Sequence, residues 1–315
     1  MISRYNFLRF FSYSIIALIF GYLLNNILTV WYDWPGVSKI FSELKSSQKN
    51  LSFIQVLIYF ASLIGILIYI FKTKKQTLEK DSKILSSISA YLIRSAFWAV
   101  FLLGIIDLLI SFLAVEKFLE VIFNEKVKFK LIAPQFRITF VHLPIILLSF
   151  VIGFFTRTTG FIWLAVLVVF SEFSIVLSRF IFSYEQAFQG DLVRFWYAAL
   201  FLFASAYALI HEGHVRVDVL YTGFSEKKKA WTNCLGSILL GAPLCLIVIF
   251  LGMHGKASII NSPILSFEVT QQGSNGLYLK YLMAGYLGVF AVSMLLQFIS
   301  YFMNSSHQIL KNLKR

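Results

Sequence analysis

Charge is scarce in this chain of 315 residues, of which 14% are charged and only 15 are acidic. An ordinary soluble domain has roughly 25% charged residues and fewer than the 58% hydrophobic residues found here. The mean hydropathy is correspondingly high, at +0.78. A soluble domain of this length has too little interior to bury so much apolar surface. The composition therefore excludes a soluble enzyme and a disordered chain, and it predicts an integral membrane protein.

Cysteine is also scarce, since Cys234 and Cys245 are the only two. Both fall in one apolar run, and a helix would place them about 16 Å apart along its axis, beyond the reach of a disulfide. This spacing excludes a secreted disulfide scaffold and indicates two small apolar side chains in one helix.

Motifs for metal, cofactor or nucleotide chemistry are missing as well. No P-loop pattern occurs, and the segment His211-Glu212-Gly213-His214 spaces its histidines by three residues where a zinc protease helix needs four. Most of the five histidines are predicted at span ends or in loops, which disfavours a membrane haem. We therefore expect no enzymatic activity, no catalytic residues, no metal and no cofactor.

Basic residues outnumber acidic ones by 28 to 15, which gives a net charge of +13. They lie between apolar runs, where they retain loops in the cytoplasm and contact anionic lipid headgroups. This distribution indicates a membrane surface as the partner and disfavours nucleic acid.

Eight apolar stretches are long enough, or nearly so, to cross the hydrocarbon core as helices of about 20 residues. The connections between them are too short to hold a soluble domain. The sequence therefore predicts an all-α integral membrane protein with about eight transmembrane helices and short loops. The predicted spans are 10–31, 51–71, 91–115, 138–156, 160–182, 195–211, 231–253 and 280–303.

The orientation follows from the basic residues in the loops. With both termini in the cytoplasm, the inner side holds 15 basic residues and the outer side 10. From Arg157 onward the ratio is 8 to 2, whereas before it the ratio is 7 to 8. Five of the outer residues lie in 116–137, a segment whose alternating pattern is compatible with an amphipathic interfacial helix. The change in bias predicts a boundary near 157–160.

Two acidic residues fall inside predicted spans, Asp107 in 91–115 and Glu172 at the centre of 160–182. A charge near the bilayer centre costs at least about 2.5–3.5 kcal/mol, so each needs an explanation. Either acid could belong to an ion or proton path, or it could be a protonated or hydrogen-bonded carboxyl at a helix contact. Neither helix offers a nearby basic partner, since Arg179 lies about 10 Å along the axis from Glu172. This favours the second interpretation.

The most distinctive stretch follows the sixth span, where the segment 214–219 reads His-Val-Arg-Val-Asp-Val. If this segment is extended, His214, Arg216 and Asp218 lie on one side, whereas a helix would make Arg216 and Asp218 diverge. Arg216 could hold a carboxylate or carbonyl of a neighbour, and the following Lys227, Lys228 and Lys229 could anchor the turn to lipid. Helix capping with lipid contact is the simpler interpretation.

This block resembles the hallmark of small permease subunits of tripartite ATP-independent periplasmic (TRAP) transporters. Further positions between 160 and 315 are similar to that family, although Tyr278 stands where its G-L-P pattern has proline. Residues 1–158 have no counterpart in a four-span small subunit and resemble an N-terminal extension of about four helices. The similar positions are His214, Arg216, Asp218 and Tyr221, the segment 178–182 with Arg179, the aromatic start 195–197, Ser266, Glu268, Gly276, Leu277 and Gln297.

The resemblance implies a membrane scaffold subunit without a substrate path of its own, in a domain spanning 159–315. A large permease subunit would carry the solute and sodium, and a periplasmic solute-binding protein would deliver an organic acid or similar solute. These family positions would then serve contacts between subunits, and the resemblance places the protein in a bacterial inner membrane. The alternative is an autonomous channel or transporter that uses Asp107 and Glu172.

Overall fold

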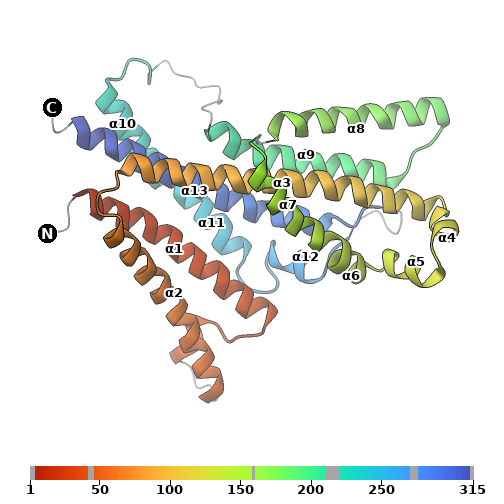
Figure 1. Ribbon diagram of the computed structural model, residues 1–315, viewed down its shortest axis with the longest axis horizontal. Coiled ribbons are helices and arrows are strands. Elements are labelled where there is room, and N and C mark those ends of the chain that lie inside the picture. Colours follow the sequence, from red (N-terminus) through yellow and green to blue (C-terminus); the bar gives the residue numbers. More distant parts are fainter. Residues whose placement is uncertain (1–3, 42–45, 158–159, 211–219, 270–275, 313–315) are drawn as a thin grey trace. The chain divides into compact units, whose positions relative to one another are not determined.

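A computed structural model describes residues 4–41, 46–157, 160–210, 220–269 and 276–312. Within these ranges the chain is helical and contains no strand (Figure 1). Eight helical segments are long and apolar enough to cross a membrane, as the hydropathy pattern predicts. The expected all-α membrane fold is therefore confirmed, while the motif residues His214, Arg216 and Asp218 lie outside the described residues.

The elements follow each other with short connections. Three segments marked η are a short 3-10 helix, η1, and two π-helical turns, η2 and η3. In order, the elements are α1 (Arg4–Trp31), η1 (Val37–Phe41), α2 (Ser46–Lys72), α3 (Leu78–Val115), α4 (Phe118–Ile122), α5 (Glu125–Ile132), α6 (Pro134–Arg137), η2 (Ile138–His142), α7 (Leu143–Phe155), α8 (Phe161–Phe182), α9 (Ala187–Ile210), α10 (Glu226–Gly236), η3 (Ser237–Gly241), α11 (Ala242–Gly252), α12 (Asn261–Leu265) and α13 (Lys280–Asn312).

The two π-helical turns share one cause. Each ends just before a proline, Pro144 after η2 and Pro243 after η3. Proline has no N–H to donate, and its ring collides with the carbonyl four residues earlier, so a regular helix cannot continue through it unchanged. The wider turn accommodates the proline, and each span continues without a break. The fourth span is therefore α6, η2 and α7 together.

The chain forms two compact units, and the expected boundary at 158/159 stays a prediction. The first unit comprises residues 1–87, 215–261 and 295–315, and the second comprises 88–214 and 262–294. Each unit thus combines residues from both sides of that boundary. Helices α3 and α13 contribute to both units.

In the first unit, α1 and α2 form an antiparallel hairpin (Figure 1). At one end, the amide of Asn25 donates to the Gln55 carbonyl at 3.1 Å, and the amide of Gln55 donates to Thr29 at 2.9 Å. Elsewhere in this unit, Ala230 and Cys234 of α10 pack with Phe302 of α13. Cys234 and Cys245 are both free and buried, which confirms that they do not pair.

A fully buried ion pair fixes the other end of that hairpin. Arg9 and Asp81 have no exposed side-chain surface, and their Nε and Oδ2 atoms are 2.5 Å apart. Arg9 also donates to the carbonyl and hydroxyl of Thr73 at 2.8 and 2.7 Å, while Gln76 and Tyr13 donate to Asp81. Arg9 is therefore neutralised inside the protein.

In the second unit, α3 packs against α7 and α9. Gly153 of α7 lies so close to Ser95 of α3 that a Cβ there would be 2.5 Å from the serine hydroxyl. On α9, the Trp196 indole donates to the Val100 carbonyl at 3.2 Å and lies against Gly104. Small residues thus allow close approach of these helices, as is typical of membrane proteins.

Two segments differ from the predictions made from the sequence. The sixth span was expected from residue 195, but α9 begins at Ala187, because Asp191 and Arg194 are part of the helix and form a polar contact there. The segment 116–137 is not one amphipathic helix but three short helices, α4, α5 and α6. Ala133 is extended because the residue before Pro134 avoids helical angles.

Candidate functional site

The N-terminal end of α13, in the second unit, gathers most of that unit's buried charge. Gly276, Leu277, Tyr278 and Leu279 lead into the helix, which begins at Lys280. The first N–H groups of a helix have no partner within it and carry partial positive charge. Carboxylates from three other segments bind at this end or just before it: Asp107 and Asp191 accept the N–H groups of Tyr278 and Leu277, and Glu268 pairs with the Lys280 side chain. We call this group the α13 cluster: Asp107, Arg137, His142, Asp191, Glu268, Tyr278, Lys280 and Tyr281.

Asp107 of α3 is the centre of the cluster and has no exposed side-chain surface. Its Oδ1 atom is 2.5 Å from Nη2 of Arg137, which is 2% exposed. The same guanidinium nitrogen donates to the Asp107 carbonyl at 2.7 Å and to the Ser111 hydroxyl at 3.0 Å. The Oδ2 atom accepts the backbone N–H of Tyr278 at 2.7 Å. Both carboxylate oxygens therefore have charged or strongly polar donors, which a buried charge requires.

His142 of η2 adds a third donor to the same carboxylate. Its Nε2 atom is 2.9 Å from Asp107 Oδ1, and its Nδ1 atom is 3.0 Å from the Tyr281 hydroxyl. Because an ionised carboxylate only accepts, Nε2 carries the proton, and Nδ1 of a neutral ring accepts from the tyrosine. His142 thus links α3 to the first turn of α13.

Tyr278 contributes its ring as well as its N–H. The Arg137 guanidinium lies over this ring, 4.4 Å from its centre. Burial raises the pKa of the Tyr278 phenol above its usual value, and the positive charge of Arg137 opposes this shift. The phenol is therefore neutral at physiological pH, and its face stabilises the cation.

Two further carboxylates hold the same segment. Asp191 of α9 accepts the N–H of Leu277 at 3.0 Å and lies 3.5 Å from Arg194. Glu268 forms an ion pair of 2.6 Å with Lys280, and its carbonyl accepts the N–H of Tyr281 at 2.9 Å. Three acids from separate segments thus stabilise one helix N-terminus.

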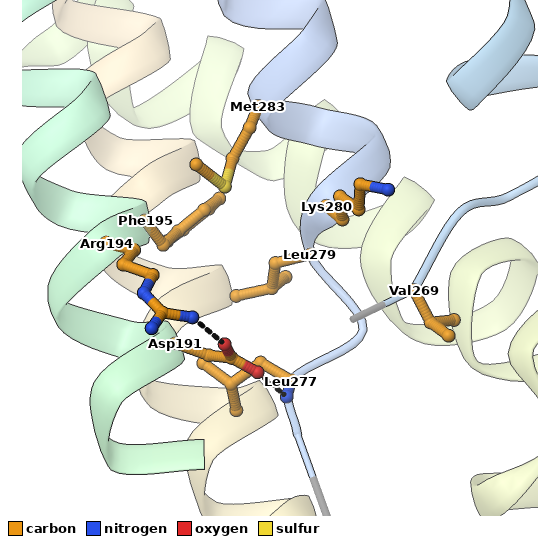
Figure 2. A pocket seen from close by; sticks show the side chains of 8 residues that line it. All are labelled: Asp191, Arg194, Phe195, Val269, Leu277, Leu279, Lys280 and Met283. Carbon is orange, nitrogen blue, oxygen red and sulfur yellow. Dashed lines mark hydrogen bonds and ion pairs between the residues drawn. The ribbon is translucent and has the colours of Figure 1, made fainter. Parts of the chain in front are cut away.

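A cavity of about 170 Å³ lies beside this segment. Figure 2 shows Asp191 between Arg194 and the backbone of Leu277, with Lys280 directed away from them. Phe195, Val269, Leu279 and Met283 complete the lining. Its charged groups already contact each other or neighbouring segments, so the geometry indicates a fixed framework and not a catalytic centre.

The two intramembrane acids have different surroundings. Asp107 is a buried, hydrogen-bonded carboxyl at a helix contact, but the expectation that it lacks a basic partner is wrong, because Arg137 pairs with it from a distant segment. Arg137 was expected as a loop charge and is instead buried. Glu172 of α8 is exposed on the surface of its helix, so it is not buried at a contact within the described chain.

The remaining family positions are dispersed. Arg179 is exposed and lies 3.5 Å from Glu185, while Glu268 belongs to the α13 cluster. In the first unit, the Tyr221 hydroxyl hydrogen-bonds with the Asn233 amide, and Gln297 is buried within α13. The structure therefore brings Asp107 and Glu268 to one helix end, and it leaves Arg179 elsewhere on the surface.

Sequence reasoning missed Arg137, His142 and Asp191 as members of the cluster. Their only signal was polarity: Arg137 and His142 flank the start of an apolar run, and Asp191 lies just before one. Nothing in their spacing from Asp107 indicates that they meet it or its neighbours.

The fold and this site define a polytopic helical membrane protein whose buried charges fix helices rather than react. Residues 165–306, a little less than half of the chain, match the family model described as "Tripartite ATP-independent periplasmic transporters, DctQ component". This region is similar to the small permease component of a TRAP transporter, which is a transport subunit. Comparisons with curated proteins and with solved structures give no match.

Proposed function

We propose that this chain is the membrane scaffold subunit of a TRAP-type secondary transporter. It assists sodium-driven uptake of an organic acid or similar solute, together with a large permease subunit and a periplasmic solute-binding protein. The observation that carries this proposal is the family match over 165–306. The α13 cluster supports a scaffold role, because its charges are paired, those of Asp107 and Arg137 are also buried, and together they hold helices in place.

The alternative of an autonomous channel gains no support from the geometry. Asp107 would have to exchange ions or protons with water, but its side chain has no exposed surface, and Arg137, His142 and Tyr278 occupy its oxygens. Glu172 lies on the outside of α8. A substrate path normally has polar groups lining a broken helix at mid-membrane.

The proposal includes a division of the sequence. Residues 159–315 form the small-permease domain, and residues 1–158 form a membrane extension that supports it. The protein is a multi-pass protein of a bacterial inner membrane with both termini in the cytoplasm. In this orientation the N-terminal end of α13 faces the periplasm, where the solute-binding protein docks.

Contacts between subunits are assigned to the family positions. His214, Arg216 and Asp218 serve this role on the cytoplasmic side with Tyr221, while Arg179, Glu268 and Gln297 act from the helices and their ends. Arginine suits such a contact because its fork of N–H groups binds a carboxylate or carbonyl with defined geometry.

The test is affinity purification of the tagged full-length chain from its native membrane in mild detergent, followed by mass spectrometry. A large polytopic membrane protein in stoichiometric amount is the expected companion. Purification of the chain alone or only with itself would overturn the proposal, as would solute uptake by liposomes that contain this chain and no other protein.

The same preparation tests the motif. Arg216→Ala should lower the yield of the complex severalfold, whereas the nearby Lys227→Ala, which removes an equal charge expected to contact lipid, should leave it unchanged. Equal yields of the complex from both variants would show that Arg216 does not contribute to the contact between subunits.

A further inference from the structure

Two membrane spans of this chain are far less covered than the others. In both α2 and α8, only 11% of the most apolar stretch is buried within the protein. Such a face is covered by lipid or by another protein, and the residues on it decide between the two. The spans can therefore be compared directly, because they differ in composition and not in exposure.

The exposed face of α2 is entirely apolar. Between residues 53 and 71, every exposed side chain is aliphatic or aromatic, or is absent at Gly65. Ile64, near the middle, is 53% exposed. This is the surface expected of a helix that faces lipid.

The exposed face of α8 has a carboxylate at its centre. Glu172 lies about 15 Å from either end of the helix, too far for its short side chain to reach the headgroups. Val169 and Val176, one turn before and after it on the same face, are 69% and 49% exposed. Within the described residues, no hydrogen bond or ion pair is recorded for the Glu172 carboxyl.

Lipid cannot satisfy this carboxyl, because hydrocarbon offers no hydrogen-bond donor. Three arginines within the described spans are already engaged: Arg9 with Asp81, Arg137 with Asp107, and Arg94 with the Gly153 carbonyl at 3.2 Å. Arg179 and Arg194 have acidic neighbours of their own, Glu185 and Asp191. A second copy of the chain, meeting this face symmetrically, would set Glu172 against Glu172. A different membrane protein with a hydrogen-bond donor at this depth would satisfy the carboxyl.

We propose that the Val169–Glu172–Val176 face of α8 is the docking surface for a transmembrane helix of the large permease subunit, and that this helix places a hydrogen-bond donor opposite Glu172. The inference rests on the proposed function and locates its subunit interface. Helix α2, which has no polar group on its exposed face, remains in contact with lipid. An acid at mid-membrane then acts as a selectivity element, because only a partner with a donor at the same depth fits it.

Photocrosslinking in the intact complex tests the contact. A photoreactive phenylalanine analogue replaces Val169 or Val176 in the full-length chain, and the matched control carries it at Ile64 of α2. We expect adducts with the large permease from both α8 positions and none from Ile64. Adducts only with lipid, with the chain itself or with a second copy, in a complex that is otherwise intact, would overturn the inference.

Substitutions test the role of the carboxyl. Glu172→Leu should lower the yield of the complex about three- to tenfold, as for the loss of one intramembrane polar contact, while the isolated chain becomes no less stable. Glu172→Gln keeps a polar group and should retain most of the complex. Equal yields for Glu172→Leu and for the wild-type chain would show that the carboxyl forms no such contact.

The outcomes separate this inference from the proposed function. If the wild-type chain recovers no large permease, the scaffold function itself fails. If the complex forms but neither α8 position crosslinks to the permease, only the docking face is wrong.

Discussion

Among the residues that the structure describes, two buried arginine–aspartate pairs are alike in chemistry and differ in their connections. In the first unit, Arg9 and Asp81 are completed by Thr73, Gln76 and Tyr13, which all belong to the first hairpin or the turn that follows it. In the second unit, Asp107 and Arg137 are completed by His142 and by the backbone of Tyr278, far along the chain.

The difference lies in which parts of the sequence depend on each pair. The Arg9 pair joins segments of the proposed extension to each other. The Asp107 pair joins that extension to the start of α13, which belongs to the matched family region. Asp107, Arg137 and His142 therefore form part of the framework around a helix of the matched region.

The largest effect is expected from removing either acid. Asp81→Ala and Asp107→Ala each leave a buried arginine without its counter-charge, which should cost about 3–5 kcal/mol of unfolding free energy. Unfolding by denaturing detergent in mixed micelles measures this loss. Hydrogen exchange should separate the two variants: Asp107→Ala should expose amides at 276–281, and Asp81→Ala should not. Exposure of the same amides in both would contradict the comparison.

A double variant provides the control for that result. Replacing Asp107 and Arg137 together by leucine removes both charges, and such exchanges are often neutral or stabilising. Stability should recover in the double variant, whereas the amide of Tyr278 should remain unprotected because its acceptor is gone. A double variant as unstable as Asp107→Ala would show that packing, and not charge, is decisive at this position.

A smaller effect is expected at Tyr278. Tyr278→Pro removes the N–H that donates to Asp107, and a hydrogen bond to a charged group is worth about 1.5–3 kcal/mol. Tyr278→Phe keeps both this N–H and the ring over Arg137, so it should be close to the wild-type chain in micelle unfolding. Equal stability of the two variants would show that the hydrogen bond from the Tyr278 N–H to Asp107 does not stabilise the protein. The proline found at this position in the family pattern could not form this link to the extension.

The smallest effect is expected from an exposed pair. Lys83 and Glu79 lie one helical turn apart on α3 at 2.7 Å, and both side chains are largely exposed. Glu79→Gln should change stability by less than about 0.5 kcal/mol, because solvent screens such pairs. A loss comparable to that of Asp81→Ala would mean that exposure is a poor guide to the importance of a charge here.

Hydropathy was sufficient to predict the eight spans, because the bilayer imposes a length that each apolar run must meet. It also located Asp107 and Glu172 within spans. It could not give their surroundings, since the helix face that packs inward depends on neighbours: Glu172 faces outward because α9 covers the opposite side of α8. The partner of Asp107 lies 30 residues away, and no local rule connects the two.

The start of α9 shows the same limit at smaller scale. A polar residue at the edge of an apolar run is normally assigned to a loop, so Asp191 was placed outside the sixth span. Within the helix, the Asp191 carboxylate accepts the N–H of Leu277, and this hydrogen bond stabilises the residue in a helical position. Local propensity could not reveal a donor that arrives from 86 residues further along the chain.

The wide turn at 138–142 determines which side chains of the fourth span can reach Asp107. Residues five apart on an α-helix differ by about 140° around the axis, so Arg137 and His142 would point to nearly opposite sides. In η2 the hydrogen bonds run between residues five apart, as from the Leu143 N–H to the Ile138 carbonyl. The wider turn brings side chains that are five residues apart to the same side of the helix. Arg137 and His142 therefore both donate to the Asp107 carboxylate. Deleting one residue from this turn would leave the span almost unchanged in length, yet it would rotate one of the two donors away.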